Sequence, residues 1–339
     1  MTTEPGTAPQ HPRHRAVAGA PGGATPPSAR VVPGPIAIMP TSDPGVADAI
    51  QRGGGVIAPL SPETRGIVWV ASSGADELAS TLDATPAVSW VQLPWAGVDA
   101  FSGVLHEFRD DGRVWTSAKG AYAQPVAEHA LTLALALMRV LPRRIRATTW
   151  QADEIGRSLY GARVVIVGAG GVALELLRLL TPFDVDVTIA RRQHAAVSGA
   201  ARTLPSTRLA EALEGAEAVF VAAALTHASH RLIGRTELAT LAPGAILVNV
   251  ARGALVDTDA VLDALGSGRL GGAGLDVTDP EPLPDGHPLW AARNCIITPH
   301  VADTDDMTAP LFAERVAANV RAFVTGGDFV GRIDPAVGY

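Results

Sequence analysis

The chain has 339 residues, of which 47% are hydrophobic and 18% are charged, and its formal net charge at pH 7 is −7. The hydrophobic fraction excludes a chain that is disordered throughout, and the negative charge argues against nucleic acid as a partner. The length indicates about two domains.

Residues 1–34 are expected to form a disordered tail. The first 30 residues hold ten Pro or Gly and no Ile, Leu, Phe, Trp or Tyr. A segment of this composition buries too little apolar area to offset the entropy that is lost on ordering.

From residue 35, short apolar runs alternate with helical or polar segments. The runs lie at residues 36–39, 55–59, 66–72, 89–94 and 113–117. This alternation predicts a parallel sheet with helices on its faces. The segment 125–141 then begins with a proline and is apolar around most of its circumference, which predicts a helix in the core or at a subunit interface.

A second series of strands begins at Val164. Its runs lie at residues 164–168, 186–190, 216–223, 245–250, 272–277 and 294–300. The series predicts a doubly wound sheet, and apolar residues at helical spacing between 309 and 324 predict a terminal helix that docks on a formed domain. We therefore predict an α/β fold with two Rossmann-like, doubly wound parallel-sheet domains.

A glycine-rich turn joins the first strand of this second series to a helix. In the run VVIVGAGGVALELLRLL, Gly168 and Gly170 follow the strand and Ala173 takes the third small position. In dinucleotide-binding folds the first glycine makes a tight turn, the second admits the pyrophosphate, and the third small residue lets the helix pack on the strand. An ordinary tight turn is the alternative, but the strand, the helix and the βαβ pattern together favour a dinucleotide site.

The end of the next strand indicates the choice of cofactor. Arg191 and Arg192 follow the run 186–190. An acidic residue at this point binds the ribose 2′-hydroxyl of NAD, whereas arginine suits the 2′-phosphate of NADP. We therefore expect NADP(H) to be preferred over NAD(H), and the alternative is a solvated basic pair.

Three further blocks resemble the D-isomer-specific 2-hydroxyacid dehydrogenase family. They are LVNVARGALVDTDAVLDAL (247–265), GAGLDVTDPEPLPDGHPLW (272–290) and ITPHVADT (297–304), and they occur in the order of that family. Other stretches extend the likeness from about residue 35 to the C-terminus. The sequence departs from the family pattern at Ala173, at Ala224, where relatives often have proline, and at Asp303.

The resemblance implies three catalytic residues. Arg252 matches the arginine that binds the substrate carboxylate, His300 the proton donor and acceptor, and Glu281 its acidic partner. A guanidinium binds a carboxylate through two hydrogen bonds, histidine titrates near pH ~6.5, and a carboxylate on one ring nitrogen fixes the tautomer. Each residue alone could be an ordinary loop residue, but all three follow strand ends, where open α/β sheets bind ligands.

The glycine motif, the arginine pair and the resemblance together give the expected binding residues. Those at the cofactor are Gly168, Gly170, Gly171, Val172, Arg191, Arg192, Thr226, Val250, Asp276 and Ala302, with Asp276 on the nicotinamide side. Those at the substrate are Ser73, Gly74, Arg252 and His300, and Trp95 is a further candidate for the wall of the cleft.

The resemblance implies an NAD(P)-dependent oxidoreductase that interconverts a small 2-oxo acid and a D-2-hydroxy acid by hydride transfer. The closest activities would be those of glyoxylate/hydroxypyruvate reductases or of phosphoglycerate dehydrogenase. One alternative is a dehydrogenase-like corepressor or interaction module without significant turnover. Another is formate dehydrogenase, whose relatives carry glutamine where Glu281 stands. The nine histidines show no metal-ligand spacing, so no metal is expected.

The domain division, the assembly and the location complete these expectations. We expect a discontinuous substrate domain of residues 35–142 and 302–339 around an NAD(P)-binding domain of residues 143–301, and a homodimer. Cys295 is the single cysteine, which fits a reducing cytoplasm. The first residues contain no apolar stretch, so no secretory signal is expected, and the longest apolar segment is shorter than the ~20 residues that span a bilayer. We therefore expect a cytoplasmic protein without a membrane segment.

Overall fold

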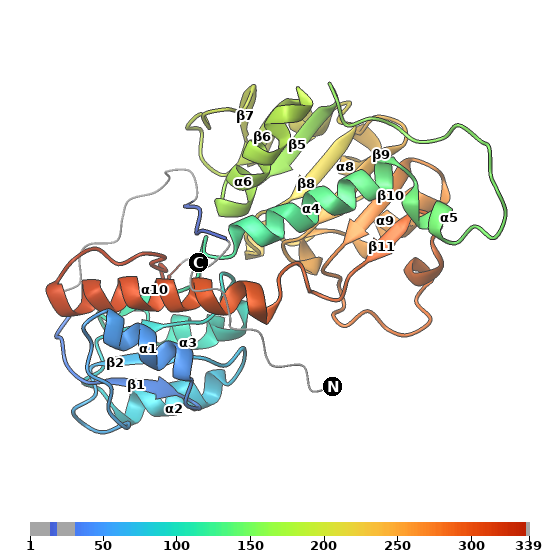
Figure 1. Cartoon of the computed structure of the whole chain (residues 1–339). Helices are drawn as coiled ribbons and strands as arrows, with labels where there is room; N and C mark the ends of the chain where they lie inside the picture. The colour runs from blue at the N-terminus through green and yellow to red at the C-terminus, as the bar shows by residue number, and fades with distance from the viewer. Residues whose placement is uncertain (1–13, 19–30, 337–339) are drawn as a thin grey trace. The chain divides into compact units, whose positions relative to one another are not determined.

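The computed structural model describes residues 14–18 and 31–336, so most of the expected N-terminal tail, residues 1–34, lies outside the described residues. Within residues 31–336 the chain divides into two compact units (Figure 1). The first unit contains the residues up to Tyr122 and those from Thr304 onward. The second unit contains Ala123–Asp303.

The first unit is built on a parallel sheet with the strand order β1-β2-β3-β4. The strands are β1 (Ile36–Met39), β2 (Gly66–Trp69), β3 (Trp90–Gln92) and β4 (Val114–Thr116). Each strand lies within a run that the sequence predicted. The run 55–59 contributes only one isolated parallel bridge, from Ile57 to Ile36, beside β1.

Helices cover both faces of this sheet. Alternate strand residues point to opposite faces, so the apolar side chains on each face need a layer of helices to bury them. The helices are α1 (Pro44–Arg52), α2 (Ala75–Ala84), η1 (Asp99–Phe101), α3 (Ser102–Glu107) and α10 (Asp305–Thr325). Trp69 of β2 contacts Phe101 with ring centroids 6.5 Å apart, whereas Trp90 of β3 contacts Phe323 of α10 at 5.1 Å. The helix predicted over 309–324 is therefore present and docks on the first unit.

The second unit contains a seven-stranded parallel sheet in the order β11-β10-β9-β8-β5-β6-β7. Its strands are β5 (Arg163–Val167), β6 (Asp186–Arg191), β7 (Arg202–Pro205), β8 (Ala218–Val221), β9 (Ala245–Asn249), β10 (Leu270–Leu275) and β11 (Cys295–Ile297). The chain starts at β5 near the middle, winds outward through β6 and β7, and returns to β8 on the other side. The point between β5 and β8 is thus the topological switch point, at which doubly wound sheets bind ligands.

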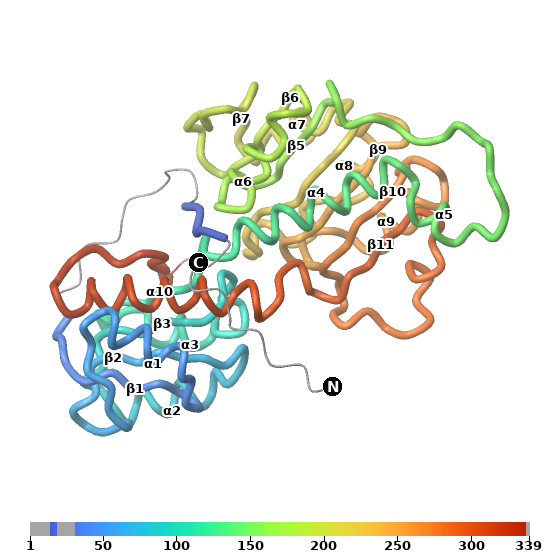
Figure 2. Tube along the Cα trace, viewed as in Figure 1, coloured from blue at the N-terminus to red at the C-terminus, as the bar shows by residue number. Residues whose placement is uncertain are grey.

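Two hydrophobic clusters fill the second unit, one on each face of the sheet. Helices α4 (Ala123–Met138) and α6 (Gly171–Leu180) lie on one face, as the Cα trace in Figure 2 shows. Helices α7 (Leu209–Leu213), α8 (Arg235–Thr240) and α9 (Thr258–Gly266) lie on the other. The remaining short helices are α5 (Leu141–Ile145), η2 (Thr181–Phe183), η3 (Ser206–Arg208), η4 (His227–Ser229), η5 (Gly253–Leu255) and η6 (Pro288–Ala291). The predicted α/β class with two parallel sheets is confirmed.

The division between the units differs from the expected boundaries at residues 142 and 302. The structure divides the chain after Tyr122 and after Asp303, so α4 belongs to the second unit. The reason is packing, because Ala127, Leu133 and Leu137 of α4 are buried in the same cluster as the inner residues of α6. Among the described residues, no helix combines the length and the apolar character that crossing a membrane requires.

Candidate active site

The turn between β5 and α6 has the geometry that a dinucleotide needs. Gly168 has a φ of 118°, and a Cβ there would lie 2.4 Å from the carbonyl oxygen of Ala222, beyond β8. A Cβ on Gly170 would instead meet no heavy atom within 4 Å. Helix α6 begins at Gly171 without a side-chain cap, so its first N–H groups face this open space. A pyrophosphate fits such a helix end, and fully buried Ala173 holds α6 against the sheet.

The two arginines at the end of β6 lie in different environments. Arg191 is buried, and its guanidinium donates to the side chain of Gln193 at 3.2 Å and to the carbonyl of Ala195 at 3.4 Å. Arg192 is exposed. Arg191 therefore holds the loop after β6 in place, while Arg192 lies at the surface.

The other expected cofactor residues in the loops after β8 and β9 are half-buried. Thr226 follows β8, and its backbone N–H donates to the Ser229 hydroxyl at 2.8 Å. The Ser229 hydroxyl donates in turn to the carbonyl of Ala224, which closes the loop. Val250 directly follows β9. These loops lie at the carboxyl ends of β8 and β9, on the same edge of the sheet as the glycine turn.

Arg252 lies in a turn that is organised by a buried asparagine. Asn249, the last residue of β9, accepts from the Ala251 N–H at 3.0 Å and donates to the Arg252 carbonyl at 2.9 Å. Arg252 is half-buried, and its guanidinium donates to the Ala251 carbonyl at 2.7 Å. A Cβ on Gly253 would lie 1.8 Å from the Thr278 carbonyl oxygen, so only glycine lets this turn approach the loop after β10. The sequence interpretation missed Asn249, whose signal was a polar residue at the end of an apolar strand.

Glu281 and His300 form a side-chain pair. His300 Nδ1 lies 2.7 Å from Glu281 Oε1, and the two side chains are 50% and 42% exposed. His300 follows β11 and has a φ of 55°, in the left-handed region that non-glycine residues rarely adopt. Its backbone N–H donates to the Asp276 carbonyl at 2.8 Å. A carboxylate on Nδ1 orients the ring so that Nε2 is the nitrogen left for a substrate.

Asp276 anchors the turn that carries His300. Its side chain is 1% exposed, and its carboxylate accepts from the backbone N–H groups of Val301 at 3.0 Å and Ala302 at 3.2 Å. The Thr298 hydroxyl donates to the same carboxylate at 2.6 Å. The carboxylate of Asp276 thus binds the chain's own backbone, on the side where the resemblance places the nicotinamide. Sequence reasoning did not single out Thr298, although a hydroxyl residue between the strand and His300 was a visible signal.

Ser73 and Gly74 belong to the first unit, at the end of the loop between β2 and α2. The Trp69 indole N–H donates to the Ser73 carbonyl at 3.0 Å, and Gly74 caps α2 with a φ of 95°. Trp95 contacts Tyr122 with ring centroids 5.8 Å apart, and among the described residues its buried indole N–H has no hydrogen-bond partner. Trp69 therefore fixes the backbone of the expected substrate loop.

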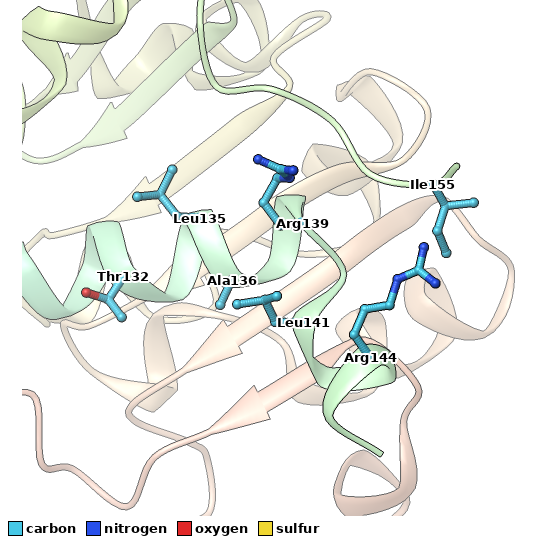
Figure 3. A pocket seen from close by; sticks show the side chains of 7 residues that line it. All are labelled: Thr132, Leu135, Ala136, Arg139, Leu141, Arg144 and Ile155. Atoms are coloured by element: carbon cyan, nitrogen blue, oxygen red, sulfur yellow. The ribbon is translucent and has the colours of Figure 1, made fainter. Parts of the chain in front are cut away.

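Other candidate features lie away from these residues. The described residues hold no group of three or more His, Cys, Asp or Glu side chains that could bind a metal. Cys295 is buried, and burial raises the pKa of its thiol to about 12, so the thiol is unreactive at neutral pH. A hollow of about 630 Å³ beside α4 and α5 is lined by none of the expected site residues (Figure 3).

Comparison with known proteins places this geometry in a family. The family model for the D-isomer specific 2-hydroxyacid dehydrogenase, NAD binding domain, matches residues 131–302. An uncharacterized protein in the proB 3′ region of Corynebacterium melassecola is 36% identical over 74% of this chain and 84% of its own length. A glyoxylate reductase of Thermofilum pendens is 30% identical over 73% of this chain and 75% of its own length.

Solved structures agree with the sequence relatives. A D-isomer specific 2-hydroxyacid dehydrogenase from Xanthobacter autotrophicus Py2, in complex with NADPH and MES, superposes with a TM-score of 0.76 and 28% identity. The match covers 91% of this chain and all of that one. The chain therefore belongs to the D-isomer-specific 2-hydroxyacid dehydrogenase family of NAD(P)-dependent oxidoreductases.

Proposed function

We propose that this protein reduces a small 2-oxo acid to the D-2-hydroxy acid, and catalyses the reverse oxidation, as a glyoxylate/hydroxypyruvate reductase or a phosphoglycerate dehydrogenase-like enzyme does. The observation that carries the proposal is the 2.7 Å pair of His300 and Glu281 in the unit that contains the dinucleotide turn. The glyoxylate reductase of Thermofilum pendens supports the substrate class.

Each protein residue has a defined part in this reaction. A bound nicotinamide supplies the hydride for reduction and accepts it in oxidation. Arg252 binds the substrate carboxylate and polarises the neighbouring carbonyl, as a planar guanidinium fork does. His300 gives the proton on Nε2 to the carbonyl oxygen as that oxygen becomes a hydroxyl, and takes it back in oxidation. Glu281 accepts a hydrogen bond from the Nδ1–H of His300 and stabilises the imidazolium by its negative charge.

We propose NADP(H) as the preferred cofactor, with Arg192 as the main ligand of the 2′-phosphate. Arg192 is exposed directly after β6, where this phosphate is expected. Arg191, on which the sequence argument for NADP(H) was mainly placed, is buried and donates to its own loop. The NADPH complex of the Xanthobacter relative supports the same cofactor.

We also propose a homodimer, formed through the connecting arm, which we define as residues 141–160. Within this arm the side chains of Ile145 and Trp150 are 79% and 95% exposed. The hollow in Figure 3 is lined by the apolar side chains of Leu135, Leu141 and Ile155 and by the basic side chains of Arg139 and Arg144, the residue before Ile145. Protruding apolar groups on an arm that also borders a partly apolar hollow make a surface that can pair with its own copy about a two-fold axis. The single buried cysteine, Cys295, supports a cytoplasmic location.

The proposed function is tested by a panel of 2-oxo acids with NADPH and with NADH. The panel contains glyoxylate, hydroxypyruvate, phosphohydroxypyruvate and longer 2-oxo acids, and oxidation of the reduced cofactor is followed by its absorbance. We expect turnover of at least one unphosphorylated acid, with NADPH used more efficiently. Binding of NADPH without turnover of any acid would contradict an enzyme and favour an interaction module.

A further inference from the structure

The side chain of His129 on α4 lies against the anchor of the His300 turn. Its Nε2 is 3.0 Å from the Thr298 hydroxyl oxygen and 3.6 Å from Asp276 Oδ1. The side chain is 21% exposed, and its helix neighbours Ala127 and Ala130 are fully buried against the sheet. None of the roles assigned above involves His129.

Counting hydrogens fixes the tautomer of this histidine. The Thr298 hydroxyl has one hydrogen, and it donates that hydrogen to Asp276 at 2.6 Å. A carboxylate accepts and does not donate, so the hydroxyl can only accept from its other neighbour. The Nε2 of His129 must therefore carry a hydrogen and donate it to Thr298.

This donation has a consequence for the turn after β11. A threonine hydroxyl rotates freely unless its neighbours decide where its hydrogen points. The N–H of His129 occupies the acceptor side of Thr298 and so directs the hydroxyl hydrogen toward Asp276. Asp276 then holds the N–H groups of Val301 and Ala302, directly after His300. These five groups form one connected set of hydrogen bonds from α4 to the turn that carries His300.

We propose that His129 is a positioning residue for the reaction: through Thr298 and Asp276 it holds His300 in the orientation that proton transfer requires. The turn needs such a restraint because His300 has a left-handed backbone, which is unfavourable for a non-glycine residue. This inference rests on the proposed reductase activity. The experiment therefore includes two measurements that do not depend on turnover.

The kinetic test compares His129→Ala, His129→Gln and Thr298→Val in the full-length protein. The amide of glutamine places a donor near the position of Nε2, so His129→Gln should stay within about threefold of wild type. His129→Ala should lower kcat about tenfold to a hundredfold with a nearly unchanged KM for the 2-oxo acid, because a small displacement of a proton donor affects the chemical step. Thr298→Val should do the same, and the double variant should be no worse than either single variant.

A matched control lies on the same helix. Gln124 is a half-buried polar residue of α4 that donates to Glu175 at 3.2 Å, away from the His300 turn. Gln124→Ala should keep kcat within about twofold of wild type. Equal losses of kcat in His129→Ala and Gln124→Ala, or no rescue by His129→Gln, would show that His129 only supports packing.

Two spectroscopic measurements decide the inference even if no substrate is found. Nitrogen-15 NMR of the histidine rings should show His129 with a hydrogen on Nε2 in the wild type. Hydrogen exchange should show protected amides at Val301 and Ala302, and at least tenfold faster exchange of both in His129→Ala and in Thr298→Val. A hydrogen on Nδ1 alone, or unchanged exchange in both variants, would overturn the inference. Absence of turnover in the wild type with these NMR results intact would instead count against the proposed function.

Discussion

His300 has an unfavourable backbone conformation that is held by several hydrogen bonds. Its φ of 55° is unfavourable for a residue with a Cβ, yet its own N–H and the next two N–H groups all donate to Asp276. The His300 N–H donates to the backbone carbonyl of Asp276, whereas the next two N–H groups donate to its charged carboxylate. Hydrogen bonds to a charged acceptor contribute about 1.5 to 3 kcal/mol each, so the two bonds to the carboxylate offset a backbone cost of about 1 to 3 kcal/mol. Strain of this kind, held by the surrounding structure, is typical of functional positions.

The role of Arg252 depends on the shape of its side chain. Replacing Arg252 by Lys keeps the charge but removes the two parallel N–H donors that match a carboxylate. We expect Arg252→Lys to lower kcat/KM for the 2-oxo acid by about a hundredfold, while the dissociation constant of NADPH changes less than about threefold. Steady-state kinetics and a fluorescence titration of NADPH measure the two effects. Near-wild-type kcat/KM in the variant would remove Arg252 from substrate binding.

The two arginines after β6 make a matched pair for testing cofactor choice. Arg192→Ala should lower kcat/KM for NADPH about tenfold and leave that for NADH nearly unchanged, because it removes a charged donor to the 2′-phosphate. Arg191→Ala removes the donors to Gln193 and Ala195, so it should lower the melting temperature more than it changes cofactor preference. A wild type that prefers NADH, or an unchanged preference in Arg192→Ala, would refute this assignment.

At the scale of elements, the apolar strands were predictable because burial on both faces gives continuous apolar runs. The sequence missed β7, since the residues of Arg202–Pro205 include an exposed arginine and a proline, which an edge strand tolerates. The expected boundary at residue 142 also put α4 with the first unit, whereas its packing groups it with the second. An all-round apolar helix does not reveal which core it enters. The glycine spacing predicted a dinucleotide turn only together with the strand before it, the helix after it and the βαβ pattern.

The contacts within the candidate site were less predictable than the residues in it. Family resemblance pointed to Glu281 and His300, which the structure brings to 2.7 Å. The burial of Arg191 depends on how the loop to Ala195 folds back, and the link from His129 to Asp276 joins residues 147 positions apart in the chain. Such tertiary contacts leave no local pattern in a single sequence.

Two glycines in the turn between β5 and α6 should have different roles, one in the stability of the fold and the other in cofactor binding. Gly168→Ala should destabilise the protein by about 1 to 3 kcal/mol, since its Cβ would meet the Ala222 carbonyl at an unfavourable φ. Gly170→Ala should change stability by less than about 0.5 kcal/mol, because its Cβ meets no atom of the chain. The same methyl group should weaken NADPH binding about tenfold by occupying the space for the pyrophosphate. Thermal unfolding and NADPH titration test both, and unchanged binding by Gly170→Ala would contradict the assignment of this turn.

At the scale of the whole molecule, the proposed homodimer can be tested at the connecting arm. Light scattering after size exclusion should give twice the chain mass for the wild type. Ile145→Asp places a charge on the exposed apolar surface and should shift the protein toward the monomer. Val56→Asp is the control, because Val56 is a similarly exposed apolar residue, at 66%, in the first unit. A monomeric wild type, or equal effects of the two substitutions, would count against dimerisation through the arm.

The central claim is that His300, oriented by Glu281, transfers the proton in the reduction of a 2-oxo acid. The most direct test measures kcat/KM for glyoxylate reduction with NADPH in the wild type and in His300→Ala, together with the dissociation constant of NADPH. We predict turnover by the wild type and a loss of about a hundredfold to ten-thousandfold in the variant, with NADPH binding retained. A variant that keeps kcat/KM within about tenfold of the wild type would contradict the claim.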